Sequence, residues 1–451
     1  MNTILAPLRE LGEYEDIQKQ LNTQQGKVSI SGCVDSQKLH MVYGLTEKYD
    51  VKLIVTYSDM KAKELLDDCK LYCRESYYFP AKDLIFYQAD IHSNQLIKER
   101  VAVLRKLLEG EPITIVTTFS ALMAHQLPLS VWQENVIEIE EGGIAEEAAI
   151  ARQLVKMGYE KNYQVEAPGQ FSVRGGIVDI FDLTRENPVR IELWGDEVES
   201  IRSFDIESQR SIEKLAEVSI YPATELILSK KALEDGLARM EKDCKKSAAF
   251  FREETKPEEA HRLEQAVAEL KEQVTQFQSF VNLESYIGYF YEETQSLVDF
   301  VADRKLCICL DEPARIEEHA NAVELEFRES MSTRAEKGYI LPEQMNVLYG
   351  AREIYARLDK NRLLALSTME YKGFPVKFQN RYAVNARNVS SYNNSFPELV
   401  KDLNHYKKNG YRVLLVSASS TRAKRLATDL MDEGLNAFYS DNSQTRLSDI
   451  F

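Results

Sequence analysis

The stretch from residue 171 to residue 211 reads FSVRGGIVDIFDLTRENPVRIELWGDEVESIRSFDIESQRS, and it decides how the chain is divided. Short segments of alternating apolar and polar residues are separated in it by Gly175-Gly176, Pro188 and Gly195. Alternation with a period of two is typical of strands that bury one face, and turn residues between such segments indicate an antiparallel sheet. The stretch therefore predicts a domain whose sheet differs from that of the flanking sequence.

One predicted strand in this stretch, Val189–Trp194, separates its residues cleanly between two faces. Its aliphatic residues fall on one face, which should pack on the core, while Arg190 and Trp194 fall on the other. Arg174 is likewise separated from the apolar residues of the strand before it. Arginine and tryptophan together are typical of protein-binding hot spots. The same pattern also fits a Trp194 that lies under a helix, with both arginines in solvated ion pairs.

Outward from this stretch, the sequence on both sides alternates buried strands with helices, which predicts a parallel sheet. A helix is predicted at about Asn94–Leu108, where apolar residues recur at helical spacing. Strands are predicted on the amino-terminal side at Val28–Ser31, Val51–Tyr57 and Ile113–Thr117, and on the carboxyl-terminal side at Leu306–Leu310 and Leu363–Thr368.

Other elements follow from the same periodicities. Within the antiparallel part, strands are predicted at Val136–Glu140, Gln164–Glu166, Phe171–Arg174, Ile177–Phe181 and Ile201–Asp205, with a helix at Ala145–Met157. Long helices are predicted at Glu258–Asn282 and Pro313–Glu329, and a last α/β unit at roughly 375–451 has strands at Arg412–Ser417 and Asn436–Tyr439 around the helix Ser420–Glu433.

The composition narrows the classes of function. The chain has 451 residues, a formal net charge of −16 and an ordinary apolar fraction of 44%. Nucleic-acid binding depends on Lys and Arg, so an acidic chain is a poor non-specific binder of DNA. No signal peptide and no apolar run of about 20 residues is present, which predicts a cytoplasmic protein without a membrane span. Six cysteines and six histidines show no clustered spacing, so no metal site is expected.

The first predicted strand runs into SGCVDSQK at Ser31–Lys38, where a nucleotide hydrolase would carry its phosphate-binding loop. Such a loop needs several glycines and a Lys followed by Ser or Thr. Here one glycine is present, Asp35 adds negative charge, and Leu39 follows Lys38. We therefore expect no nucleotide hydrolysis and no bound cofactor. No catalytic constellation is apparent elsewhere, so no catalytic residue is predicted.

Three segments carry a resemblance to a known family: RGGIVDIF at Arg174–Phe181, PVRIE at Pro188–Glu192 and GDEVESIR at Gly195–Arg202. They resemble the signature shared by UvrB and the transcription-repair coupling factors. In that family this is domain 2, the domain that UvrA binds. The resemblance implies that Arg174, Arg190 and Trp194 contact UvrA. The family pattern often has Phe where this chain has Trp194. Because both residues are aromatic, the character of this position is kept.

Two features favour a coupling factor over UvrB. The phosphate loop is degenerate, and the short segment between Pro80 and Asn94 leaves no room for the aromatic-rich hairpin of UvrB. LDEPAR at Leu310–Arg315 also resembles the coupling factors. The competing interpretation is a UvrB-type DNA-dependent ATPase or damage-recognition module. We expect an α/β multidomain fold with a UvrB-like parallel-sheet domain 1, an inserted α+β domain 2 and a small α/β domain 3. The expected boundaries are 1–135 and 224–345 for domain 1, 136–223 for domain 2, and 346–451 for a linker and domain 3.

The resemblance implies a non-catalytic amino-terminal module that recruits UvrA to stalled RNA polymerase in transcription-coupled nucleotide excision repair. In that family an RNA-polymerase-binding domain and an ATP-driven DNA translocase follow, with ATP and Mg in the motor domains. Nothing up to Phe451 matches a motor. We therefore expect a portion of a longer bacterial protein, which binds RNA polymerase and duplex DNA through its missing part.

Overall fold

The computed structural model describes residues 4–82, 94–276, 283–389, 391–393, 395–417 and 419–440. Its largest sheet has seven strands, all parallel, in the order β15-β1-β14-β13-β2-β4-β3. The parallel sheet predicted for the first domain is therefore confirmed. The strands are β1 (Lys27–Ser31), β2 (Val51–Thr56), β3 (Ser76–Phe79), β4 (Ile113–Thr118), β13 (Leu306–Asp311), β14 (Leu363–Ser367) and β15 (Asn380–Ala383).

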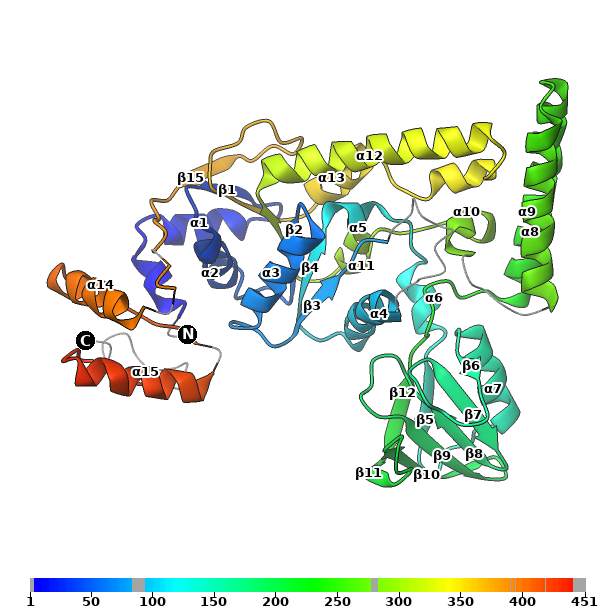
Figure 1. The fold of residues 1–451 in the computed structure, drawn as a ribbon, viewed down its shortest axis with the longest axis horizontal. Helices are drawn as coiled ribbons and strands as arrows, with labels where there is room; N and C mark the ends of the chain where they lie inside the picture. Colours follow the sequence, from blue (N-terminus) through cyan, green and yellow to red (C-terminus); the bar gives the residue numbers. More distant parts are fainter. Residues whose placement is uncertain are drawn as a thin grey trace.

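Helices cover both faces of this sheet (Figure 1). In β2, Leu53 and Val55 enter one core while Ile54 enters the other. Burial on both sides explains why these strands are nearly continuous apolar runs. One face is covered by α1 (Tyr14–Leu21), α2 (Asp35–Leu45) and α3 (Asp59–Cys69), and the other by α4 (Asn94–Glu109), α5 (Phe119–Met123), α11 (Leu297–Val301), α12 (Pro313–Glu336) and α13 (Ala351–Asp359).

Residues 137–220 form a separate lobe with its own sheets (Figure 1). Its main sheet has the order β11-β10-β9-β8-β7-β6, antiparallel except for the β6–β7 pair. The helix α7 (Glu147–Lys156) packs on the apolar face of this sheet. The strands are β5 (Ile137–Glu140), β6 (Glu160–Lys161), β7 (Gln170–Arg174), β8 (Ile177–Ile180), β9 (Val189–Trp194), β10 (Glu197–Phe204), β11 (Ser211–Leu215) and β12 (Glu217–Ile220), of which β5 and β12 pair with each other.

Two long helices, α8 (Lys230–Glu253) and α9 (Pro257–Gln276), pack along each other at one end of the molecule (Figure 1). The predicted helix Glu258–Asn282 is present as far as Gln276, and residues 277–282 lie outside the described part. In the described residues no helix is both long and apolar enough to cross a membrane. The short helices are η1 (Ala6–Glu10), α6 (Leu129–Gln133), η2 (Leu283–Tyr286), α10 (Ile287–Phe290) and η3 (Pro342–Asn346).

The large sheet continues beyond the boundary predicted at residue 345. β14 lies between β1 and β13, and β15 pairs with the other edge of β1. The predicted range 346–451 for a linker and domain 3 therefore includes two strands of the first domain's sheet. Periodicity identified β14 as a buried strand, but it carries no information on which sheet a strand joins.

Several predicted strands do not form. Gln164–Glu166, Arg412–Ser417 and Asn436–Tyr439 have no strand pairing, and the apolar side chains from Val413 to Val416 are exposed. A strand forms by pairing with a neighbouring strand, and in the described part of the chain none of these three segments is paired in this way. The predicted small α/β domain 3 is thus represented by the helices α14 (Phe396–Lys408) and α15 (Ser420–Asp432). The segment where UvrB would carry its hairpin lies largely at 83–93, outside the described residues.

Candidate functional site

The degenerate phosphate-loop segment connects β1 to α2 at the carboxyl edge of the large sheet. Gly32 has a φ of +80°, and a Cβ on it would lie 2.0 Å from the carbonyl oxygen of Val384. Only glycine fits this close approach. Lys38 lies in the first turns of α2, and only 2% of its surface is exposed. The segment therefore directs a lysine into the protein.

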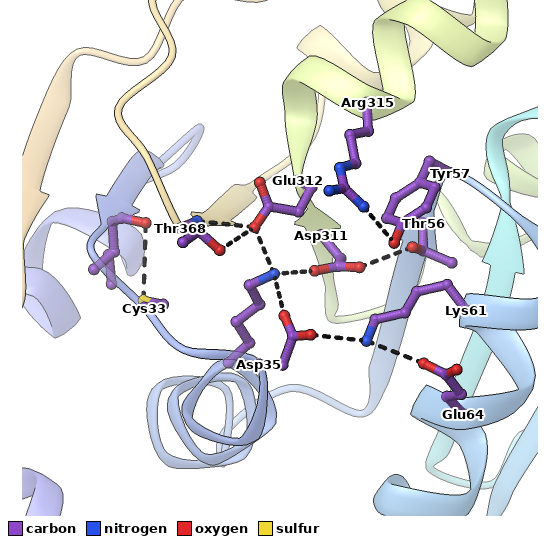
Figure 2. Close-up of polar contacts among 12 residues, drawn as sticks. Cys33, Asp35, Thr56, Tyr57, Lys61, Glu64, Asp311, Glu312, Arg315 and Thr368 are labelled. Carbon is purple, nitrogen blue, oxygen red and sulfur yellow. Dashed lines mark hydrogen bonds and ion pairs between the residues drawn. The ribbon is translucent and has the colours of Figure 1, made fainter. Parts of the chain in front are cut away.

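Three carboxylates surround the buried ammonium of Lys38 (Figure 2). Lys38 Nζ lies 2.9 Å from Asp35 Oδ1, 2.8 Å from Asp311 Oδ1 and 2.7 Å from Glu312 Oε1. Asp311 ends β13, and Glu312 precedes α12 with a φ of +57°. We call these four residues the Lys38 cluster.

Hydroxyl and amide groups complete the Lys38 cluster (Figure 2). Thr56 Oγ1 at the end of β2 donates to Asp311 Oδ2 at 2.8 Å. Thr368, just after β14, donates to Glu312 Oε1 from its backbone nitrogen at 2.8 Å and from its hydroxyl at 2.7 Å. Together with Thr56 and Thr368, the Lys38 cluster thus joins the carboxyl ends of β1, β2, β13 and β14, where ligands bind in open parallel sheets.

In the Lys38 cluster, charge pairing and hydrogen bonding shift the pKa values of Lys38 and Glu312 more than burial does. Burial alone would lower the pKa of Lys38, but Asp311, Glu312 and Asp35 together raise it above its ordinary value. Burial alone would raise the pKa of Glu312, but hydrogen bonds from Lys38 and Thr368 and the charge of Lys38 lower it. Lys38 and Glu312 therefore both stay charged at neutral pH. The described residues hold no group of His, Cys, Asp and Glu that could bind a metal ion.

The second candidate site is the face of the six-stranded sheet opposite α7, here called the outer face. In β9, Val189, Ile191 and Leu193 are buried, as the alternating pattern predicted. Trp194 ends this strand on the outer face with 79% of its surface exposed. The interpretation that placed Trp194 under a neighbouring helix is therefore wrong.

Arg174 and Arg190 meet on the outer face at a carboxylate that sequence reasoning missed. Asp179 lies on β8 between the two arginines' strands and is only 1% exposed. Arg174 Nη2 donates to Asp179 Oδ2 at 2.7 Å. Arg190 donates to Asp179 through Nε at 2.7 Å and through Nη2 at 2.9 Å. The two predicted site residues are thus brought together through one shared acceptor.

Arg190 has two further neighbours. Its guanidinium carbon lies 4.4 Å from the centre of the Phe204 ring, and its Nη2 donates to Gln209 at 3.0 Å. The hydrogen bonds to Asp179 raise the pKa of Arg190 despite its partial burial. Arg190 is therefore held in one orientation, and its side chain is 18% exposed against 36% for Arg174.

Trp194 lies on the same face as the two arginines but further along the sheet. The strand pairings place Arg190, Arg174 and Trp194 in three successive cross-strand rows. Rows on one face are two residues apart, or about 6.6 Å along a strand. The three predicted residues therefore share one face of the sheet, with the tryptophan at one end and Glu192 between Arg190 and Trp194 along β9. Glu192 in the middle row pairs with Arg202.

A signal for the missed residue is present in the sequence. Asp179 interrupts the otherwise apolar strand Ile177–Ile180. Strand pairing places it in one row across the sheet with Ser172, Arg190, Arg202 and Lys214. A buried carboxylate in a strand needs a charged partner. Periodicity assigns the face of each residue, but it does not identify which residues lie opposite on neighbouring strands.

Comparison with known proteins identifies relatives over almost the whole chain. Residues 137–226 match the family described as UvrB interaction domain. The transcription-repair-coupling factor of Bacillus subtilis is 30% identical over 447 residues, which is 98% of this chain and 38% of the relative. Those of Staphylococcus epidermidis and Staphylococcus aureus are 26% and 25% identical, over 90% and 95% of this chain. The chain thus spans less than two fifths of the length of these curated relatives. It is a homologue of the amino-terminal, UvrB-like part of the transcription-repair-coupling factors, with a UvrB interaction domain at residues 137–226.

Proposed function

We propose that this chain is a non-catalytic module that recruits UvrA to stalled RNA polymerase in transcription-coupled nucleotide excision repair. The observation that supports this most is the outer face, where Arg174, Arg190 and the exposed Trp194 lie within the segment that matches the UvrB interaction domain. An exposed tryptophan on the same face as two arginines has the composition of an interface hot spot.

In this proposal, the chain provides UvrA binding, and the rest of a coupling factor provides the other activities. Residues 136–223 provide the UvrA platform, and the parallel-sheet domain serves as its scaffold. We assign ATP-driven translocation with Mg, and the binding of RNA polymerase and duplex DNA, to the part of a coupling factor that lies outside the 38% of the relative matched by this chain. The proposed setting is the bacterial cytoplasm.

The test is to measure, by calorimetry, the affinity of purified UvrA for the Trp194→Ala variant of this chain. Removal of an exposed anchor should weaken binding by about 2 kcal/mol or more, roughly thirtyfold. Because Trp194 is exposed, its removal should change the free energy of unfolding by less than about 0.5 kcal/mol. Arg152→Ala is the matched control, since Arg152 lies exposed on α7 behind the sheet and should leave binding unchanged.

The two arginines need conservative substitution, because each also neutralises the buried Asp179. Arg174→Lys with Arg190→Lys keeps both charges but removes the planar fork that binds a carboxylate through two bonds. This double variant should lose UvrA affinity while circular dichroism still shows the wild-type fold. Normal UvrA binding by folded Trp194→Ala and by the folded double lysine variant would overturn the assignment of this surface.

The competing function is a UvrB-type DNA-dependent ATPase or damage-recognition module. The Lys38 cluster weighs against it, because Lys38 already has three carboxylate partners and Asp35 would repel a phosphate. We propose that the chain binds and hydrolyses no nucleotide. Calorimetry with MgATP should show no heat of binding. A micromolar dissociation constant that Lys38→Ala abolishes would favour the competing function.

A further inference from the structure

Asp179 lies at the centre of the outer face but contributes almost no surface to it. It is 1% exposed, and its two oxygens accept three hydrogen bonds from guanidinium groups. These donors come from the two strands that flank β8, namely β7 with Arg174 and β9 with Arg190. A carboxylate this deeply covered is unavailable to a partner, so its effect on binding must act through the arginines.

The hydrogen bonds to Asp179 leave particular donors for a partner. Arg190 uses Nε and Nη2 internally, and Arg174 uses Nη2. Arg190 Nη1, and Arg174 Nε and Nη1, donate to no acceptor in the part of the chain that the structure describes. The shared carboxylate therefore fixes the guanidinium plane of Arg190 through two bonds and tethers Arg174 through one, while other N–H groups of both arginines remain free for a partner. Such an arrangement suits a carboxylate, which accepts several N–H bonds at once.

Asp179 also sets the charge of this surface. Two guanidinium groups and one carboxylate give a net charge of +1, in a domain where acidic residues outnumber basic ones. A single positive charge with directed donors fits one carboxylate of a protein partner. A phosphate backbone is bound chiefly by accumulated positive charge, so it gains little here.

We propose that Asp179 is a positioning residue, which orients Arg174 and Arg190 to grip a carboxylate on the partner and limits their attraction for nucleic acid. This inference rests on the proposed function, in which the partner is UvrA. Orientation before binding removes the entropy cost of fixing two long side chains at the interface. The loss of Asp179 should therefore weaken protein binding and strengthen DNA binding, two effects of opposite sign.

The test is Asp179→Asn, which keeps the shape of the side chain and removes its charge. Affinity for purified UvrA should fall about tenfold, while affinity for a duplex DNA oligonucleotide at low salt should rise severalfold. A residue with a purely structural role would not strengthen DNA binding. Glu217→Gln removes an exposed carboxylate on β12 and serves as the matched charge control.

A double-mutant cycle separates this inference from the proposed function. Asp179→Asn should cost little further UvrA affinity when Arg174 and Arg190 are already lysines. If the lysine variant binds UvrA normally, the proposed surface is wrong. If the lysine variant loses affinity but Asp179→Asn binds both UvrA and DNA like the wild type, the role of Asp179 is wrong.

A second variant applies if Asp179→Asn does not fold. Gln209 lies outside the strands, and its side-chain oxygen accepts a hydrogen bond from Arg190 Nη2 at 3.0 Å. Its backbone has a φ of +57°. Gln209→Asn tolerates this backbone but has a shorter side chain. It should weaken UvrA binding severalfold with no change in melting temperature, and unchanged binding would contradict the positioning of Arg190.

Discussion

At the scale of single residues, the Lys38 ammonium illustrates how a buried charge depends on its partners. Removing one member of a buried ion-pair network typically costs about 3–5 kcal/mol, because the remaining charges stay buried. Lys38→Met leaves Asp311 and Glu312 facing each other, with side chains only 5% and 16% exposed. We expect a loss of about 3–5 kcal/mol in the free energy of unfolding, measured with urea.

The control for this prediction is Lys70→Met. Lys70 pairs with Asp67 on α3, but both side chains are exposed, and such surface pairs contribute less than about 1 kcal/mol. Equal small losses in the two variants would show that the Lys38 cluster is not a buried network.

The Lys38 cluster also predicts a pH dependence. The pKa of Glu312 is lower in the folded protein than its ordinary value of about 4.3. A group of this kind stabilises the fold above its unfolded pKa, and that stabilisation is lost as the pH falls through the folded pKa. Lys38, whose pKa is raised, stays charged throughout this acidic range. The stability difference between wild type and Lys38→Met should be full at neutral pH and shrink below about pH 4.

The measurement is urea denaturation of both proteins at a series of pH values. A stability difference that stays constant from neutral pH down to about pH 3 would contradict the role of Glu312 in the Lys38 cluster.

The sequence predicted the faces of site residues but not their partners. Alternation placed Arg190 and Trp194 opposite the apolar side of their strand, and the structure confirms this for both. Asp179 could not be found in the same way, since its partners lie on neighbouring strands at positions set by register. Register depends on turn geometry and on the packing of all strands together.

At the scale of elements, burial decided which predictions succeeded. Strands such as β2, β4 and β13 were predicted because a strand buried on both faces must be apolar along its length. The run Arg412–Ser417 has the same composition, yet it is exposed and unpaired among the described residues. Composition indicates that a segment can form a strand, whereas pairing decides whether it does.

The helix α4 holds the separate lobe against the large domain. Arg100 of α4 is fully buried, and its Nε donates to Glu225 at 2.8 Å, just after the chain leaves the lobe. Lys82 lies 2.8 Å from the other oxygen of Glu225. Nearby, Arg105 of α4 donates to Thr184 in the lobe at 2.6 Å. These contacts fix the lobe's connection to the scaffold.

Glu225→Gln tests this connection. The amide cannot neutralise Arg100 and Lys82, so the variant should lose about 3–5 kcal/mol in the free energy of unfolding. Glu111→Gln, which removes an exposed partner of Lys106, is the control and should cost less than about 1 kcal/mol. Chemical denaturation followed by circular dichroism gives both values. A loss as small as that of the control would mean that Glu225 does not join the two parts.

At the scale of the whole molecule, strand order could not be predicted from the sequence. The switch from parallel to antiparallel patterning predicted a separate domain at residues 136–223, and the lobe of the structure spans residues 137–220, because each sheet type has its own periodicity. Nothing in that periodicity shows that β14 lies between β1 and β13. Consecutive strands are often neighbours, but among the described residues β1 pairs only with strands more than 300 residues later.

This strand order predicts how much of the chain the first domain needs. A chain that ends at residue 345 lacks β14 and β15, so β1 loses all its described strand partners and β13 loses one of two. It also loses the buried side chains of α13 and β14, which belong to the cores on both faces. Exposed strand edges with missing core residues favour aggregation. We therefore expect this shorter chain to aggregate or to unfold without a cooperative transition.

A chain that ends at residue 389 is the matched comparison. It keeps all seven strands and also Val384, whose backbone nitrogen donates to Ser31. It lacks α14 and α15, whose buried residues form a small core of their own. Because the large cores remain complete, this chain should be monomeric in size-exclusion chromatography and melt cooperatively near the full-length temperature. Cooperative melting of the chain that ends at 345 would show instead that β14 is dispensable, and that the first domain closes its sheet without it.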